Sequence, residues 1–69
     1  MADYAAVAAV LEDLPRLVRQ ARERRGMSAR EVACRIGVGH TTVPRVEAGN
    51  GCNSVTAIAL LRWLAEEDR

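Results

Sequence analysis

The stretch from residue 22 to residue 49, RERRGMSAREVACRIGVGHTTVPRVEAG, contains the signals that decide the fold. Ser28 and Glu31 are spaced as a capping box, in which the serine hydroxyl and the glutamate carboxylate each accept from the other residue's amide. A helix therefore begins after the serine, and its inward positions are Val32, Ala33 and Ile36. Gly37 ends this helix and permits a tight turn. The sequence predicts a second, shorter helix directly after that turn.

A proline lies inside this second helix. If Gly39 is the N-cap, Pro44 is the fifth helical residue and removes the bond to the His40 carbonyl, at a cost of about 3 kcal/mol. If the cap is instead His40, Thr41 or Thr42, Pro44 falls among the first four residues, whose amides have no intrahelical partner. We therefore expect a helix that is short, late-starting or bent. Its exposed N-terminal amides are expected to point towards an anion.

Two helices are predicted before this pair. The first covers Tyr4 to Glu12, because large apolar residues recur there at spacings of three and four with alanines between them. Asp13 is the expected N-cap of the next helix, so Pro15 falls in the first turn of that helix. The helix ends at about Arg25.

The last predicted helix runs from Val55 to about Glu66 and is capped by Ser54. It is apolar on nearly every side, so we expect it to be buried on more than one side, against the core and against either the N-terminal helix or a second copy. The predicted fold class is all-α, a compact bundle of about five short helices. It forms a single domain over residues 1–69, with an extra N-terminal helix in 1–13, a two-helix motif in 28–48 and a C-terminal helix in 54–66.

Charge is distributed unevenly along the chain. Residues 14–46 contain eight arginines against two glutamates, a net +6, whereas residues 1–13 carry −3 and residues 47–69 carry −2. A basic centre between acidic ends indicates a face that meets an anion. The alternative is a solvated arginine-rich surface with no such partner.

The composition excludes several function classes. No apolar run reaches membrane-spanning length and no basic leader precedes the first apolar run, so we expect a cytoplasmic protein. Two cysteines and one histidine do not form a zinc site of known spacing, so no metal or cofactor is expected. We expect both thiols to be reduced and Cys34 to be buried. A disulfide is the alternative only if the protein meets an oxidising compartment. Without paired carboxylates or a nucleotide-binding glycine loop, an enzyme is not expected.

The stretch quoted above resembles the Cro/repressor-type helix-turn-helix family, also called lambda-repressor-like or XRE. Flanking helices also fall where that family has them, so the resemblance covers about three quarters of the chain. Three positions depart from the family pattern: Ala29 replaces a glutamine that contacts a DNA phosphate, Gly39 replaces a serine N-cap, and Pro44 replaces a small residue. The resemblance also implies that Glu47 is structural and pairs with an arginine of a neighbouring helix.

By this resemblance, the second helix of the motif reads double-stranded DNA. The candidates for base contacts are His40, Thr41, Thr42 and Arg45. The candidates for phosphate contacts are Arg24, Arg25, Arg30, Arg35 and Asn50. Arg30 is expected to compensate for the missing glutamine.

The expected function is that of a sequence-specific transcriptional regulator of phage or prophage repressor or Cro-like type, which binds an operator as a homodimer. Candidates for the dimer interface are Tyr4, Val7, Leu11, Leu60, Trp63 and Leu64. No membrane and no small-molecule substrate is expected as a partner. The alternative is a protein-interaction module on the same fold, such as an antitoxin-like or host-factor-binding phage protein. The departures from the family pattern and the near-neutral total charge favour that alternative.

Overall fold

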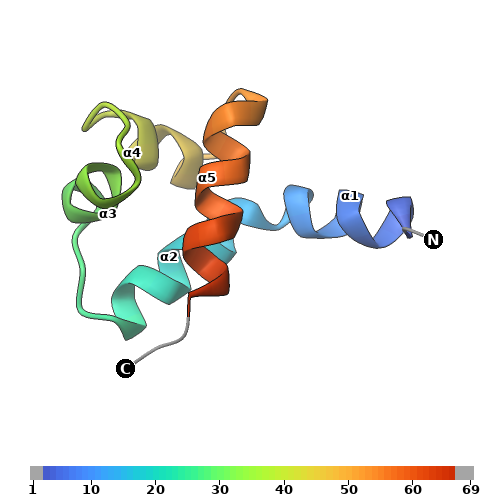
Figure 1. Ribbon diagram of the computed structural model, residues 1–69, viewed down its shortest axis with the longest axis horizontal. Helices are drawn as coiled ribbons and strands as arrows, with labels where there is room; N and C mark the ends of the chain where they lie inside the picture. The colour runs from blue at the N-terminus through green and yellow to red at the C-terminus, as the bar shows by residue number, and fades with distance from the viewer. Residues whose placement is uncertain (1–2, 67–69) are drawn as a thin grey trace.

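Helices account for all the regular secondary structure of residues 3–66, the part of the chain that the computed structural model describes (Figure 1). The five helices are α1 Tyr4–Glu12, α2 Leu14–Arg24, α3 Ala29–Ile36, α4 Thr42–Glu47 and α5 Ser54–Ala65. The predicted all-α bundle of about five short helices is confirmed.

Side-chain caps fix where three of the helices begin. The Asp3 carboxylate accepts from the Ala6 amide at the start of α1. The predicted capping box of α3 is present in both directions, with distances of 3.1 and 2.9 Å. At α5 the predicted cap is wrong by one residue: Asn53 is the N-cap and accepts from the Thr56 amide at 2.8 Å, while Ser54 is the first helical residue.

Asp13 separates α1 from α2 and is the N-cap of α2, as predicted, with Pro15 at the second helical position. Its carboxylate forms an ion pair with Arg16 and makes no capping hydrogen bond. Proline is tolerated at this point because the first amides of a helix have no intrahelical acceptor. The chain therefore passes from α1 into α2 with a single residue between the two helices.

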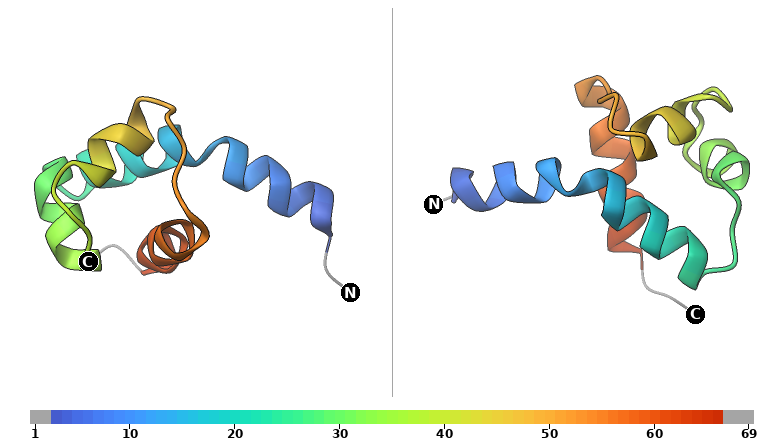
Figure 2. Two further views of the ribbon diagram at one scale, coloured as in Figure 1. Left: turned by 90° about the horizontal axis from the view of Figure 1, so that it is seen from above. Right: turned by 180° about the vertical axis from the view of Figure 1, so that it is seen from behind.

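The hydrophobic core lies between α2, α3, α4 and α5. It consists of Leu14, Val18, Ala21, Val32, Ala33, Val43, Val46, Leu60 and Trp63. These residues come from all four helices and from no residue of α1. In Figure 2 the four helices enclose one volume, whereas α1 extends away from it in both views.

Three predictions about burial are corrected by this arrangement. Cys34 is exposed, because it lies on the face of α3 opposite to Val32 and Ala33. Leu60 and Trp63 are buried in the core of one chain, so neither side chain is left to contact a second copy.

One side of α5 packs on the core, as expected, but its other side is not covered by residues 3–66, so of the two predicted coverings only a second copy stays open. Val55 is 73% exposed and Ile58 is 50% exposed. Leu64 is half-buried and packs against the core. Within residues 3–66, no helix is both long enough and apolar enough to cross a bilayer.

Candidate nucleic-acid interface

The turn between α3 and α4 depends on Gly37. This residue has a φ of 78°, in the left-handed region that glycine adopts without strain. Its amide donates to the Cys34 carbonyl, and the next amide, of Val38, donates to the Ala33 carbonyl at 3.0 Å. The half-buried Val38 side chain then packs on the core. The turn therefore sets the direction in which α4 leaves α3.

The structure places Pro44 where a helix can accept it. Thr41 is the N-cap of α4, so Pro44 is the third helical residue and its missing amide removes no intrahelical bond. The prediction of a short, late-starting helix is confirmed, and Gly39 is not the cap. The Thr42 amide donates to the Gly39 carbonyl at 3.0 Å. With this amide bonded and none at Pro44, the end of α4 presents fewer amides to an anion than expected.

The two faces of α4 have opposite surroundings. Val43 and Val46 point inward and are fully buried. Pro44 and Arg45 point outward and are exposed, while Thr42 is half-buried at the edge. The outward face of α4 is therefore available to a partner.

Arg45 borders a small polar hollow of about 260 Å³. The hollow lies between α4, the following loop and the start of α5, and is lined by Thr42, Arg45, Asn50, Gly51, Cys52, Asn53 and Thr56. The Asn50 amide donates to the Arg45 carbonyl at 3.0 Å, which closes the loop onto the end of α4. The structure thus brings together Thr42, Arg45 and Asn50 from the predicted set. Sequence reasoning did not place Asn53 and Thr56 beside this hollow. The signal was present, because an asparagine followed three residues later by a threonine has the spacing of an N-cap and the amide that bonds to it.

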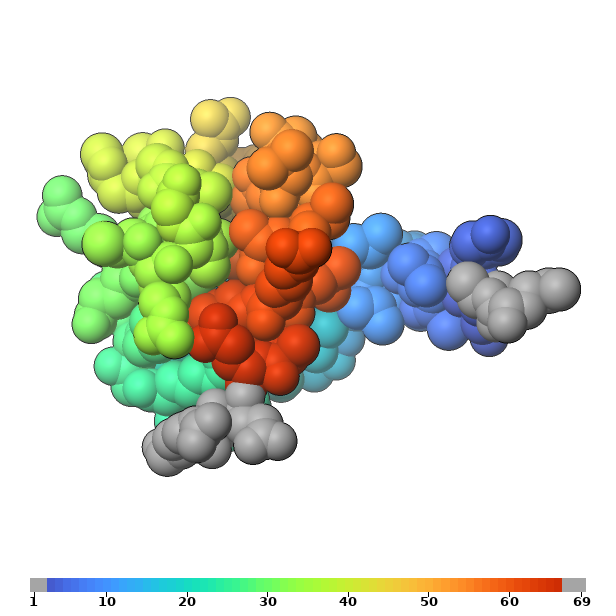
Figure 3. Space-filling view, viewed as in Figure 1, coloured from blue at the N-terminus to red at the C-terminus, as the bar shows by residue number. Residues whose placement is uncertain are grey.

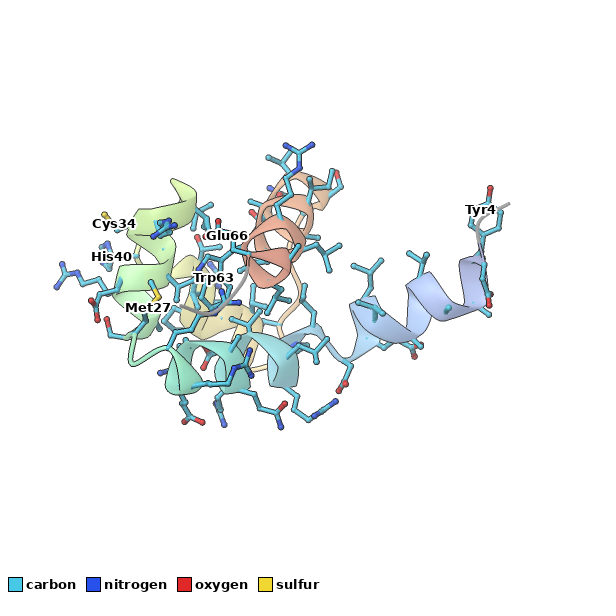
Figure 4. All side chains as sticks on the ribbon, turned by 60° about the horizontal axis from the view of Figure 1, so that its bottom comes forward. Tyr4, Met27, Cys34, His40, Trp63 and Glu66 are labelled. Atoms are coloured by element: carbon cyan, nitrogen blue, oxygen red, sulfur yellow. The ribbon has the colours of Figure 1, made fainter. Side chains whose placement is uncertain are left out.

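The remaining base-contact candidates precede the helix. His40 and Thr41 are both exposed, in the turn before α4 and at its N-cap. In Figure 4, His40 and Cys34 lie at the end of the molecule opposite Tyr4. His40 does not line the polar hollow that contains Arg45.

Glu47 anchors the inner side of α4 to α2. Its carboxylate accepts from Nε of Arg22 at 2.7 Å, from Nη2 of Arg22 at 3.0 Å and from Nε of Arg19 at 3.3 Å. The side chain of Glu47 is only 4% exposed. Burial raises the pKa of the Glu47 carboxyl, but the bonds from Arg22 and Arg19 lower it further, so that the pKa lies below its ordinary value. The predicted structural pairing of Glu47 with an arginine of a neighbouring helix is confirmed.

Three predicted phosphate contacts lie near α5 and away from the α4 hollow. Arg25 donates to the Trp63, Leu64 and Glu66 carbonyls, so its guanidinium completes the end of α5 and is not available to a phosphate. Arg35 forms an ion pair with Glu66 at 2.8 Å. Arg24 borders an apolar hollow shared with Val10 and Leu64. The structure does not bring these arginines together with Arg45.

Two of the candidate arginines remain uncompensated. Within residues 3–66, Arg30 and Arg45 take part in no ion pair, and both side chains are exposed. Arg30 is the second residue of α3, beside the position where the family pattern has glutamine. Among the same residues, no group of three or more His, Cys, Asp or Glu side chains is arranged to hold a metal ion.

Comparison with known proteins agrees with this geometry. A family model described as a helix-turn-helix domain, of the XRE/Cro-like kind, matches residues 13–67. The match begins at the N-cap of α2 and includes α2 to α5, while α1 lies outside it. No curated protein and no solved structure matches the chain.

Proposed function

We propose that this chain, which belongs to the XRE/Cro-like family of helix-turn-helix domains, is a sequence-specific transcriptional regulator that binds operator DNA as a dimer. It would act in the bacterial cytosol, as a repressor of phage or prophage or Cro-like type. The observation that carries the proposal is the outward face of α4, where Arg45 and Thr42 stand beside Asn50 on a helix held by buried valines.

This face has the chemistry of base readout. An arginine on a helix in the major groove binds O6 and N7 of guanine with two parallel hydrogen bonds. Threonine offers a hydroxyl to a base edge and a methyl group to thymine. Arg45 would therefore recognise guanine, and His40, Thr41 and Thr42 would contact neighbouring bases.

Phosphate contacts would come from Arg30 and Asn50, which lie on either side of α4 in the chain. Arg35 would contribute only if its ion pair with Glu66 opened, because the carboxylate already neutralises the guanidinium. Because few arginines per copy are uncompensated, we expect the affinity for DNA to depend only modestly on salt concentration. Each neutralised phosphate adds about 0.9 to the slope of log K against log salt.

The test is selection of bound duplexes from a random DNA pool by the purified chain at moderate salt. An enriched inverted repeat, with half-sites about 34 Å apart, is the expected result, because a twofold dimer presents two copies of α4 at that spacing. Salt-sensitive binding without enrichment would indicate phosphate contact alone and would overturn sequence-specific regulation. Absence of binding at low salt would overturn the proposal as a whole.

A second candidate function is favoured by the internal use of arginines. Four arginines already have partners within the chain. Glu47 pairs with Arg19 and Arg22, and Glu66 pairs with Arg35. Arg25 donates to the end of α5, so less positive charge is left for DNA than the sequence suggests. In this alternative the domain is a protein-interaction module, antitoxin-like or host-factor-binding. The same selection separates the two, because counterion release accompanies DNA binding and not the binding of a neutral protein surface.

A further inference from the structure

The N-terminal helix α1 is poorly covered by the rest of residues 3–66. None of its nine residues is buried, and Tyr4 is 80% exposed. Figure 3 shows α1 as a protrusion from the body of the molecule. Isolated helices shorter than about 12–15 residues are marginal in water, so packing normally stabilises a helix of this length. This helix also lies outside the region that matches the family.

The exposed side chains of α1 form one apolar stripe. Tyr4, Val7, Val10 and Leu11 follow spacings of three and four, which places them on one face of the helix. Leu14, the next residue in the stripe, is already buried in the core. The stripe therefore continues the core surface, and within residues 3–66 its side chains stay 42–80% exposed.

An apolar groove of about 670 Å³ lies beside this stripe. Val7 and Leu11 of α1 form one wall, and Ala57, Ile58 and Leu61 of α5 form the other. Since α1 of the same chain is already a wall of the groove, it does not fill the groove in this arrangement. No other segment of residues 3–66 fills the groove, which is therefore open to a partner.

The surface area indicates how large that occupant is. The chain exposes 4892 Å², whereas a compact monomer of 7.5 kDa is expected to expose about 4,250 Å². The excess of about 650 Å² per chain amounts to about 1,300 Å² for two chains. Stable protein–protein interfaces bury about 1,200–2,000 Å² in total. Covering about 650 Å² on each chain would bring its exposed surface to that of a compact monomer and would lie at the lower end of this range.

We propose that two copies associate by exchanging α1: the stripe of one copy lies in the groove of its partner, and the partner's stripe lies in the first groove. One twofold operation covers both stripes and fills both grooves, so the interface is self-complementary. This inference deepens the dimer of the proposed function by naming its interface. It replaces the predicted contacts at Leu60 and Trp63, which are buried, and keeps those at Tyr4, Val7 and Leu11.

The test is sedimentation velocity on the full chain and on two matched variants, over a series of concentrations and without DNA. Val7→Glu places a charge in the stripe, and Val55→Glu makes the same change on the exposed side of α5, outside the groove. We expect a wild-type dimer, a dissociation constant raised about a hundredfold by Val7→Glu because the change occurs twice per dimer, and no change for Val55→Glu. Ile58→Glu, in the opposite wall of the groove, should weaken the dimer as Val7→Glu does.

Circular dichroism of each variant checks that the bundle is intact, which we expect because neither Val7 nor Ile58 is buried in the core. A wild-type chain that stays monomeric at every concentration overturns the inference. So does a Val7→Glu variant that dimerises as tightly as the wild type, or a Val55→Glu variant weakened to the same extent. A chain that dimerises through α1 and binds no DNA overturns the proposed function alone.

Discussion

The guanidinium of Arg25 lies 4.6 Å from the centroid of the Trp63 ring, and its nitrogens donate to carbonyls at the end of α5. A cation over an indole face is attracted by the ring quadrupole, and a positive charge at a helix C-terminus is favoured by the helix dipole. One side chain at the end of α2 therefore holds the last turn of α5. This explains why an arginine predicted to bind phosphate serves the fold.

Replacing Arg25 with alanine should lower the free energy of unfolding by about 2 kcal/mol, since it removes the ring contact and the bonds to the carbonyls at the end of α5. Urea unfolding followed by circular dichroism measures this loss. Arg62→Ala, which removes an exposed arginine from α5, is the control and should stay within about 0.5 kcal/mol of the wild type. Equal losses in both variants would contradict the structural role of Arg25.

Glu47→Gln should lower the free energy of unfolding by about 2 kcal/mol at neutral pH, because it removes a charged acceptor from Arg22 and Arg19. The folded pKa of Glu47 is depressed, so its contribution is present above the unfolded carboxyl pKa of about 4.3 and is lost as pH falls through the lower folded pKa. The difference between wild type and variant should therefore shrink below about pH 4. Urea titrations at several pH values measure it.

The control for this pH dependence is Glu23→Gln, which changes an exposed carboxylate on α2. It should alter stability far less at neutral pH. A Glu47→Gln difference that stays constant down to the acid transition would contradict the assignment of the pH dependence to this carboxylate.

Pro44→Ala should change the free energy of unfolding by no more than about 1 kcal/mol, because a proline in the first turn breaks no helical bond and restricts the unfolded chain. A proline in the helix interior would instead give a gain of about 3 kcal/mol on replacement by alanine. Pro15→Ala, at the second position of α2, is a matched control. The two variants should behave alike in thermal and urea unfolding.

Arg45→Ala should relax the sequence preference obtained from the random DNA pool, with a loss of about 1–3 kcal/mol of discrimination at one base position in each half-site. Arg30→Ala should weaken binding to all sequences about equally and reduce the salt slope by about 1 per copy. Repeating the selection and the salt titration with both variants measures these effects. A uniform loss in Arg45→Ala with the preference intact would assign this arginine to phosphate.

The sequence predicted the local features well because they depend on neighbouring residues. The α3 capping box, the turn at Gly37 and the proline-tolerant start of α4 follow from short-range spacing. The bounds of α1 were also predicted correctly. These features require no knowledge of how distant parts of the chain pack. The pairing of Glu47 with Arg22, 25 residues away, is not local and was implied by the family pattern alone.

The failures concern contacts between residues far apart in sequence. Arg25 was assigned to phosphate because nothing local shows that its guanidinium meets the end of α5, 38 residues away. Trp63 was assigned to a dimer interface because an apolar helix does not reveal which of its sides the chain itself covers. Cys34 was placed inside by residue type, although its position on α3 is opposite to the buried side chains.

In the proposed function, the shortness of α4 would limit how much sequence information one copy could read from DNA. A helix of six residues is about 9 Å long, and base pairs are spaced 3.4 Å apart along the duplex, so α4 spans about three of them. Three base pairs distinguish about 64 sequences, and a bacterial chromosome offers about a million or more competing positions. A site that one copy recognises would therefore occur by chance every few turns of the DNA duplex. Selective occupancy of one operator would require the combined reading of two copies and of the spacing between them.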